Sequence, residues 1–117
     1  MRVVCLISGE GTNLQALIDW QANGLLGDAR IVAVISNTAA ALGLERAGNA
    51  GIPTKILSQR DFSNRCAFDH ALIQFIDVYE PNLVVLAGFM RILTSGFVTH
   101  YERRLINIHP SLLPKYK

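Results

Sequence analysis

Five short apolar runs punctuate the chain, and each has the length of a β-strand. They carry few charges, favour β-branched residues and stop at glycine or polar residues, which is typical of strands buried on both faces. They span residues 3–7, 31–35, 54–57, 83–87 and 105–108. The pattern therefore predicts a sheet that lies inside the protein.

Amphipathic segments separate these runs and predict three main helices. The first follows a glycine-rich loop, with Thr12 or Asn13 as the expected cap. The second covers residues 39–49. The third is expected to be capped by Asp61 or Ser63, and its apolar side chains recur at helical spacing. These side chains are Phe68, Leu72, Phe75 and Tyr79.

Strands that are hydrophobic on both faces and alternate with helices indicate a parallel sheet covered by helices on each side. The predicted fold class is therefore α/β and Rossmann-like, within a single domain. In such sheets, ligands bind beyond the carboxyl ends of the strands, where the strand order reverses. The segments after Ile7, Ile35, Ala87 and Ile108 are thus the places to search for a site.

Composition narrows the range of partners. The 117 residues carry a net charge of +2 with mixed signs, which gives no electrostatic case for binding nucleic acid or a membrane surface. Apolar runs stay far below the roughly 20 residues of a membrane span, and no secretory pattern follows Met1. Cys5 and Cys66 lack metal-ligand spacing and are expected to be free thiols. We expect a soluble cytoplasmic protein without a metal site.

The loop of residues 8–13, SGEGTN, joins the first strand to a helix. Gly11 lets the backbone approach an anion, and the N–H groups of the first helical turn, with the side chains of Thr12 and Asn13, can donate hydrogen bonds to it. Leu14 replaces the third glycine of a dinucleotide fingerprint, and the Walker lysine is absent. The loop predicts a site for a single phosphate, or alternatively a tight turn that binds no ligand.

The segment of residues 87–93, AGFMRIL, leaves the fourth strand at the same expected edge of the sheet. Its backbone amides and carbonyls can bond the edge of a flat heterocycle while apolar side chains flank the ring faces. The alternative is that these apolar side chains belong to the core.

Residues 107–114, NIHPSLLP, follow the last strand. In an extended chain, Asn107 and His109 point to the same side, and Pro110 keeps His109 extended. This pair suits acyl transfer to an amine, because Asn107 and a protonated His109 can stabilise an oxyanion and His109 can move a proton. Alternatively, His109 satisfies backbone groups of its own loop. His70 and His100 lie in less informative surroundings and are expected to be bystanders.

Three stretches together resemble the glycinamide ribonucleotide formyltransferase family, which takes its formyl group from 10-formyltetrahydrofolate. They are residues 6–15 (LISGEGTNLQ), 86–93 (LAGFMRIL) and 107–114 (NIHPSLLP). The histidine loop is shared with methionyl-tRNA formyltransferase and formyltetrahydrofolate deformylase, so the glycine loop is the more discriminating motif. The resemblance implies that residues 1–117 are the amino-terminal part of one formyltransferase domain.

The resemblance also implies residue roles. The residues that it implies for the substrate phosphate are Gly11, Thr12 and Asn13. The residues that it implies for the folate are Arg65, Met90, Arg91, Ile92, Leu93 and Asn107. Asn107 and His109 match the catalytic asparagine and histidine of the family. The small-molecule substrate implied is glycinamide ribonucleotide.

The family's domain continues beyond Lys117 and includes there an aspartate that orients the histidine. We therefore expect little turnover from these 117 residues alone, and self-association through an uncovered strand edge. Two alternatives stay open. One is another formyl-folate enzyme, a deformylase or a methionyl-tRNA formyltransferase. The other is a non-catalytic remnant that binds phosphate or folate.

Overall fold

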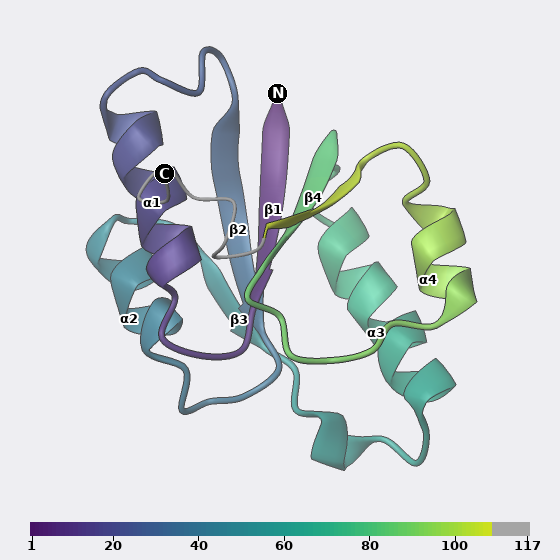
Figure 1. Cartoon of the computed structure of the whole chain (residues 1–117). Helices are drawn as coiled ribbons and strands as arrows, with labels where there is room; N and C mark the ends of the chain where they lie inside the picture. Colours follow the sequence, from purple (N-terminus) through teal and green to yellow (C-terminus); the bar gives the residue numbers. More distant parts are fainter. Residues whose placement is uncertain (109–117) are drawn as a thin grey trace.

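The computed structural model describes residues 1–108 as a central parallel sheet flanked by helices (Figure 1). The elements in chain order are β1 (Arg2–Ile7), α1 (Thr12–Ala22), β2 (Arg30–Ser36), α2 (Leu42–Asn49), β3 (Thr54–Ile56), η1 (Gln59–Asp61), α3 (Arg65–Asp77), β4 (Leu83–Ala87), α4 (Ser95–His100) and β5 (Leu105–Ile108). The five predicted strands are thus present, each within one residue of the predicted bounds.

The sheet is parallel throughout and has the order β3-β2-β1-β4-β5. The chain moves outward from β1 in one direction through β3, and then crosses to the other side of β1 to form β4 and β5. The order therefore reverses between β1 and β4. Loops at the carboxyl ends of these two strands flank the crevice in which doubly wound sheets bind ligands.

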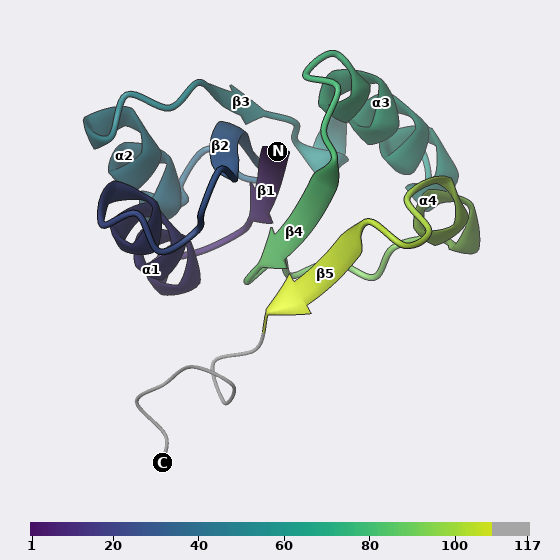
Figure 2. The same ribbon diagram turned by 90° about the horizontal axis from the view of Figure 1, so that it is seen from above.

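Helices cover both faces of the sheet, with α1 and α2 on one side and α3 and α4 on the other (Figure 2). Alternate residues of β1 enter the two cores: Cys5 packs in the cluster that contains Leu14, and Leu6 packs in the cluster that contains Phe68 and Leu72. All five of these side chains are buried. Because residues 3–7 of β1 are all buried, they form a continuous apolar run. The α/β, Rossmann-like prediction is confirmed.

Helix starts were predicted less well than strands. Asn64, and not Asp61 or Ser63, caps α3, because its Oδ1 accepts a 2.8 Å hydrogen bond from the backbone N–H of Ala67. Helix α2 begins at Leu42, three residues later than expected. The short elements η1 and α4 were not predicted at all, since six residues or fewer carry little periodicity.

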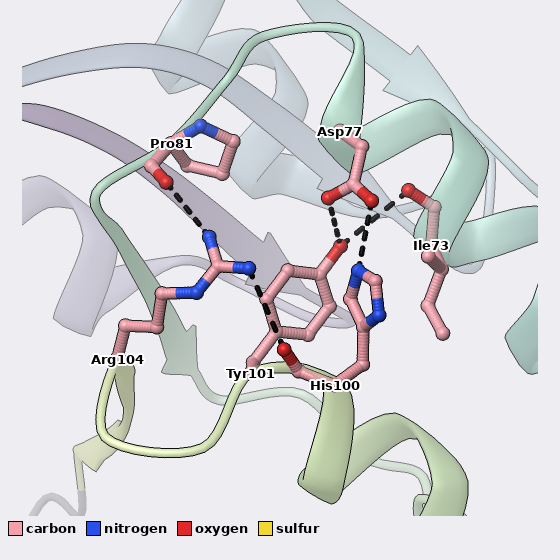
Figure 3. A network of polar contacts seen from close by, with 6 residues as sticks. All are labelled: Ile73, Asp77, Pro81, His100, Tyr101 and Arg104. Carbon is pink, nitrogen blue, oxygen red and sulfur yellow. Dashed lines mark hydrogen bonds and ion pairs between the residues drawn. The ribbon is translucent and has the colours of Figure 1, made fainter.

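A polar network joins α3, α4 and the start of β4 at the amino-terminal end of the sheet (Figure 3). The buried Tyr101 hydroxyl donates a 2.7 Å hydrogen bond to Oδ1 of Asp77, and Nε2 of His100 lies 2.8 Å from Oδ2 of the same carboxylate. Arg104 stacks over the Tyr101 ring and donates to the carbonyl of Pro81. His100 therefore holds a structural position, far from the carboxyl ends of the strands.

We expect Tyr101 to lower stability at alkaline pH. Burial, and then the hydrogen bond to Asp77, raises the pKa of Tyr101 above its usual value of about 10. Its contribution is complete below that pH and declines above it, because the unfolded chain then releases a proton that the native state retains. Tyr101→Phe should unfold more easily by about 1–2 kcal/mol at neutral pH, yet lose less stability above about pH 10.

Urea unfolding at a series of pH values checks this expectation. Tyr79→Phe, which leaves the Tyr101–Asp77 bond intact, is the matched control. Equal alkaline slopes in Tyr101→Phe and the unmodified chain would contradict the assignment.

The two cysteines should differ sharply in reactivity. Cys5 is buried in β1, and burial raises the pKa of its thiol to about 12, whereas Cys66 is exposed on the first turn of α3. Only the thiolate is nucleophilic, so we expect Cys66 alone to react with a disulfide reagent in the folded chain, and both thiols to react after denaturation. Rapid reaction of both thiols under native conditions would argue against this packing of β1.

Candidate active site

The loop after β1 reaches α1 with glycine at the start of the helix. Gly11 is the N-cap residue, with a φ of 79°, and no side chain in the described part of the chain accepts a hydrogen bond from the first turn. The first backbone bond of the helix runs from the N–H of Gln15 to the carbonyl of Gly11 at 2.8 Å. The expected capping by Thr12 or Asn13 is therefore wrong. The amides of residues 12–14 precede the first helical bond, and the helix dipole favours an anion beside them.

Two glycines let this loop lie directly against α2. A Cβ atom on Gly11 would come within 2.5 Å of the Cα atom of Gly43, and a Cβ atom on Gly43 would come equally close to the side chain of Ile7. The N–H of Gly43 donates to the carbonyl of Gly9, and Nε of Arg46 donates to the carbonyl of Glu10 at 2.7 Å. Helix α2 thus supports the predicted phosphate loop.

Sequence reasoning missed the role of Gly43. A signal was available, because glycine inside a helix costs about 1 kcal/mol relative to alanine and so indicates close packing when it occurs there.

Asn13 connects the loop to the last strand. Its side chain is buried, and Nδ2 donates a 3.4 Å hydrogen bond to the carbonyl of Ile108 at the carboxyl end of β5. Its Oδ1 has no hydrogen-bond partner among residues 1–108. A groove of about 360 Å³ lies beside it, lined by residues 9–13 and by Ala87, Gly88 and Met90. The loops after β1 and β4 therefore share one groove, and Asn13 ties it to the end of β5.

The segment after β4 begins at Gly88, whose φ is 81°. The N–H of Met90 donates a 2.7 Å hydrogen bond to Oγ of Ser8, which fixes the segment to the loop after β1. The side chains of Met90 and Ile92 are 80% and 73% exposed, so they are not core residues. Leu93 packs against the core on the α3 side of the sheet. The exposure of Met90 and Ile92 favours the interpretation that they contact a ligand. Leu93 instead fits the alternative, that its side chain belongs to the core.

Two further predicted folate residues are positioned by α3. Arg65 is the exposed first residue of that helix. The side chain of Arg91 turns toward α3, where Nη1 donates a 2.8 Å hydrogen bond to Oε1 of Gln59 and the guanidinium stacks 4.1 Å from the centre of the Phe68 ring. The side chain of Arg91 therefore packs largely against the protein, with 15% of it exposed.

Asn107 lies on β5, in register with Leu86 of β4, and is exposed. It stands one residue before Ile108, whose carbonyl accepts the bond from Asn13. The structure therefore brings Asn107 to the same end of the sheet as the loop after β1. His109 lies outside the described residues, so its expected pairing with Asn107 stays a prediction.

Residues 1–108 contain no group of three or more His, Cys, Asp or Glu side chains arranged to hold a metal ion. Within the same range, no helix is long and apolar enough to cross a membrane.

The whole sequence, residues 1–117, matches the family model described as formyl transferase, so the chain belongs to the formyl transferase family. It is 58% identical over 117 residues to the phosphoribosylglycinamide formyltransferase of Escherichia coli (strain K12), covering 99% of this chain and 54% of that protein.

The likeness extends to a multidomain protein and to solved structures. The chain is 47% identical over 116 residues to the trifunctional purine biosynthetic protein adenosine-3 of Homo sapiens, covering 99% of this chain and 11% of that protein. The phosphoribosylglycinamide formyltransferase from Coxiella burnetii, solved with CHES, superposes with a TM-score of 0.90 at 55% identity, over 99% of this chain and 54% of that one. The chain thus spans about half the length of its bacterial relatives.

Proposed function

We propose that this chain forms the amino-terminal half of a cytoplasmic formyltransferase domain that transfers a formyl group from 10-formyltetrahydrofolate to the amine of glycinamide ribonucleotide, in purine biosynthesis. The observation that carries the proposal is the hydrogen bond from Asn13 to Ile108, at 3.4 Å. It joins the loop suited to a phosphate with the strand that holds Asn107. A substrate whose phosphate lies at residues 11–13 therefore extends toward the catalytic residues.

The phosphate end of the site uses the start of α1. Gly11 keeps the backbone close to the groove, and the amides of Thr12 and Asn13 precede the first helical hydrogen bond. An anion at this position receives N–H donors and the favourable end of the helix dipole. No side chain of residues 1–108 caps α1, which leaves these donors available to the phosphate.

The folate end uses the segment after β4, whose backbone is available for hydrogen bonding. Among residues 1–108, the amides and carbonyls of residues 89–93 make no backbone–backbone hydrogen bonds, and only the N–H of Met90 donates to a side chain, that of Ser8. The exposed side chains of Met90 and Ile92 offer apolar contact beside this backbone. These features fit a flat heterocycle with donors and acceptors on its edge. When bound, 10-formyltetrahydrofolate supplies the formyl group.

The reacting centre uses Asn107 and, by resemblance, His109. The side-chain amide of Asn107 would donate a hydrogen bond to the carbonyl oxygen that gains charge as the amine attacks. His109 would take up the proton that the amine releases and deliver it to the departing nitrogen. Neither role requires a covalent bond to the protein or a metal ion.

Calorimetric titration with glycinamide ribonucleotide tests this proposal. The dephosphorylated ribonucleoside is the control ligand, because it retains the amine and the ribose and lacks only the phosphate. We expect the ribonucleotide to bind at least about tenfold more tightly, as charge-assisted hydrogen bonds contribute 1.5–3 kcal/mol. Folic acid, which cannot donate a formyl group, should bind whether or not the ribonucleotide is present. Equal affinity for both glycinamide ligands, or binding of neither, would refute the proposal.

We also propose that the chain self-associates through β5. Among the described strands, none pairs with the outer edge of β5, and Ile106 on it is 46% exposed. An uncovered edge with an apolar side chain favours pairing with another strand. Light scattering should detect a dimer or a larger assembly at high protein concentration, and a strictly monomeric chain would contradict this.

A further inference from the structure

A buried carboxylate beneath the segment after β4 has no part in the site described so far. Asp69 lies one helical turn after Arg65 on α3 and is only 2% exposed. Its Oδ2 accepts a 2.7 Å hydrogen bond from the backbone N–H of Thr94, and its Oδ1 lies 3.7 Å from Nε of Arg91. Asp69 therefore contacts residues 91 and 94, on either side of Ile92 and Leu93.

The contact with Arg91 is part of a layered arrangement. The guanidinium of Arg91 lies over the Phe68 ring, donates to Gln59 of η1 and faces Asp69 from the same side. This arrangement holds the side chain of Arg91 against the protein, with 15% of it exposed. While the side chain of Arg91 faces α3, the next residue, Ile92, is 73% exposed.

The amino-terminal end of the segment has a separate anchor, the bond from the N–H of Met90 to Oγ of Ser8. The segment is thus fixed at residues 90, 91 and 94, and Asp69 makes two of these three attachments. Thr94 also caps α4, because its hydroxyl oxygen accepts a hydrogen bond from the N–H of Phe97. The bond from Thr94 to Asp69 therefore sets where α4 begins as well as where the segment ends.

The contacts of Asp69 tie it to the segment above it. Burying a carboxylate is unfavourable unless its oxygens are hydrogen-bonded. Its Oδ2 accepts a hydrogen bond from Thr94, whereas its Oδ1 has no hydrogen-bond partner among residues 1–108 and faces Nε of Arg91 at 3.7 Å. An apolar residue at this position would leave the N–H of Thr94 without this acceptor and Arg91 without its ion pair. The carboxylate is therefore explained by the conformation that it imposes on the segment above it.

We propose that Asp69 is a positioning residue for folate binding: it holds Arg91 and Thr94 so that the backbone of residues 91–93 is presented to the heterocycle. This inference rests on the proposed function, because it takes the segment after β4 as the folate-binding segment. Asp69 itself does not touch the ligand. It acts by keeping in one conformation a stretch whose backbone would otherwise have to be ordered by the ligand, at a cost in affinity.

Two measurements on Asp69→Ala test the inference. Amide hydrogen exchange followed by NMR should show that the N–H of Thr94 exchanges at least about tenfold faster, because its acceptor is lost. Folic acid should bind at least about tenfold more weakly, while the affinity for glycinamide ribonucleotide stays within about twofold, since residues 11–13 are untouched. A general loss of stability would weaken both ligands alike.

Asp77→Asn is the matched control, because it alters the other aspartate of α3 that bonds a neighbouring element and lies away from the segment. It should leave both the exchange of Thr94 and the affinity for folic acid unchanged. Asp69→Asn serves as a second variant if the alanine variant does not fold: it retains an acceptor for Thr94 and removes the charge opposite Arg91. It should retain most of the protection of Thr94 and lose part of the folate affinity.

The two proposals fail in different ways. If the unmodified chain binds no folic acid, the proposed function fails, and the exchange of Thr94 still decides whether Asp69 orders the segment. If the unmodified chain binds folic acid and Asp69→Ala binds it equally well, the positioning role of Asp69 is overturned. Unchanged protection of Thr94 in Asp69→Ala would overturn it as well.

Discussion

Replacement of Gly11 by alanine is expected to lower the free energy of unfolding by about 2–5 kcal/mol. About 1–2 kcal/mol comes from placing a Cβ atom at a φ of 79°, which only glycine adopts freely. A further 1–3 kcal/mol, roughly, comes from the contact of that atom with the Cα atom of Gly43 at 2.5 Å, because backbone cannot move aside as a side chain can. Urea unfolding monitored by circular dichroism measures the difference.

Gly24→Ala provides a close control for the contact term. Gly24 has a similar φ of 75°, yet a Cβ atom there would meet no atom of residues 1–108 within 4 Å. We expect the free energy of unfolding of Gly24→Ala to fall only by the cost of the backbone conformation, about 1–2 kcal/mol. If both variants lose the same stability, the loop after β1 does not pack on α2 as described. Helix α2 would then not support the predicted phosphate site.

Replacement of Asn13 by alanine is expected to weaken the binding of glycinamide ribonucleotide by about 10- to 100-fold. The variant loses the bond from Nδ2 to the carbonyl of Ile108 and a side-chain donor at the groove. Hydrogen bonds to charged groups contribute about 1.5–3 kcal/mol, which corresponds to this range. The unfolding free energy should fall much less, because a 3.4 Å bond between neutral groups is weak.

The control is Asn23→Ala, the same substitution at the carboxyl end of α1. Asn23 also makes a side-chain hydrogen bond, from Nδ2 to the carbonyl of Asp19 at 2.9 Å, but it caps the carboxyl end of α1. Asn23→Ala should alter stability without altering affinity for the ribonucleotide. If Asn13→Ala binds glycinamide ribonucleotide with an unchanged dissociation constant, the start of α1 is not part of the binding site.

The fold could be predicted from the sequence because β1, β2 and β4 are buried on both faces. Such strands need apolar residues along their buried length, so their limits stand out in the sequence, as at Leu83–Ala87, whose bounds match the prediction. Helix starts depend on single capping residues instead. At α3 several polar residues precede the helix, and only the folded geometry selects Asn64.

The candidate site was readable only in part. The glycine loop, the segment after β4 and Asn107 were predicted as one site because the carboxyl ends of parallel strands meet at one edge. The bond from Asn13 to Ile108 agrees with that rule, and the roles of these residues stay predictions. Gly43 and Asp69 were missed, because their importance lies in contacts with residues 32 and 25 positions away, Gly11 and Thr94. No local pattern reveals such pairs.

The proposed function requires a phosphate site and a folate site at the same edge of the sheet. Chemical-shift mapping of the backbone amides locates both sites, with glycinamide ribonucleotide and folic acid added in turn. We expect the ribonucleotide to shift the amides of residues 11–14 and 107–108, and folic acid to shift those of residues 90–94. Shifts confined to the groove at the opposite end of the sheet, beside Arg2, Arg30 and Tyr79, would contradict it.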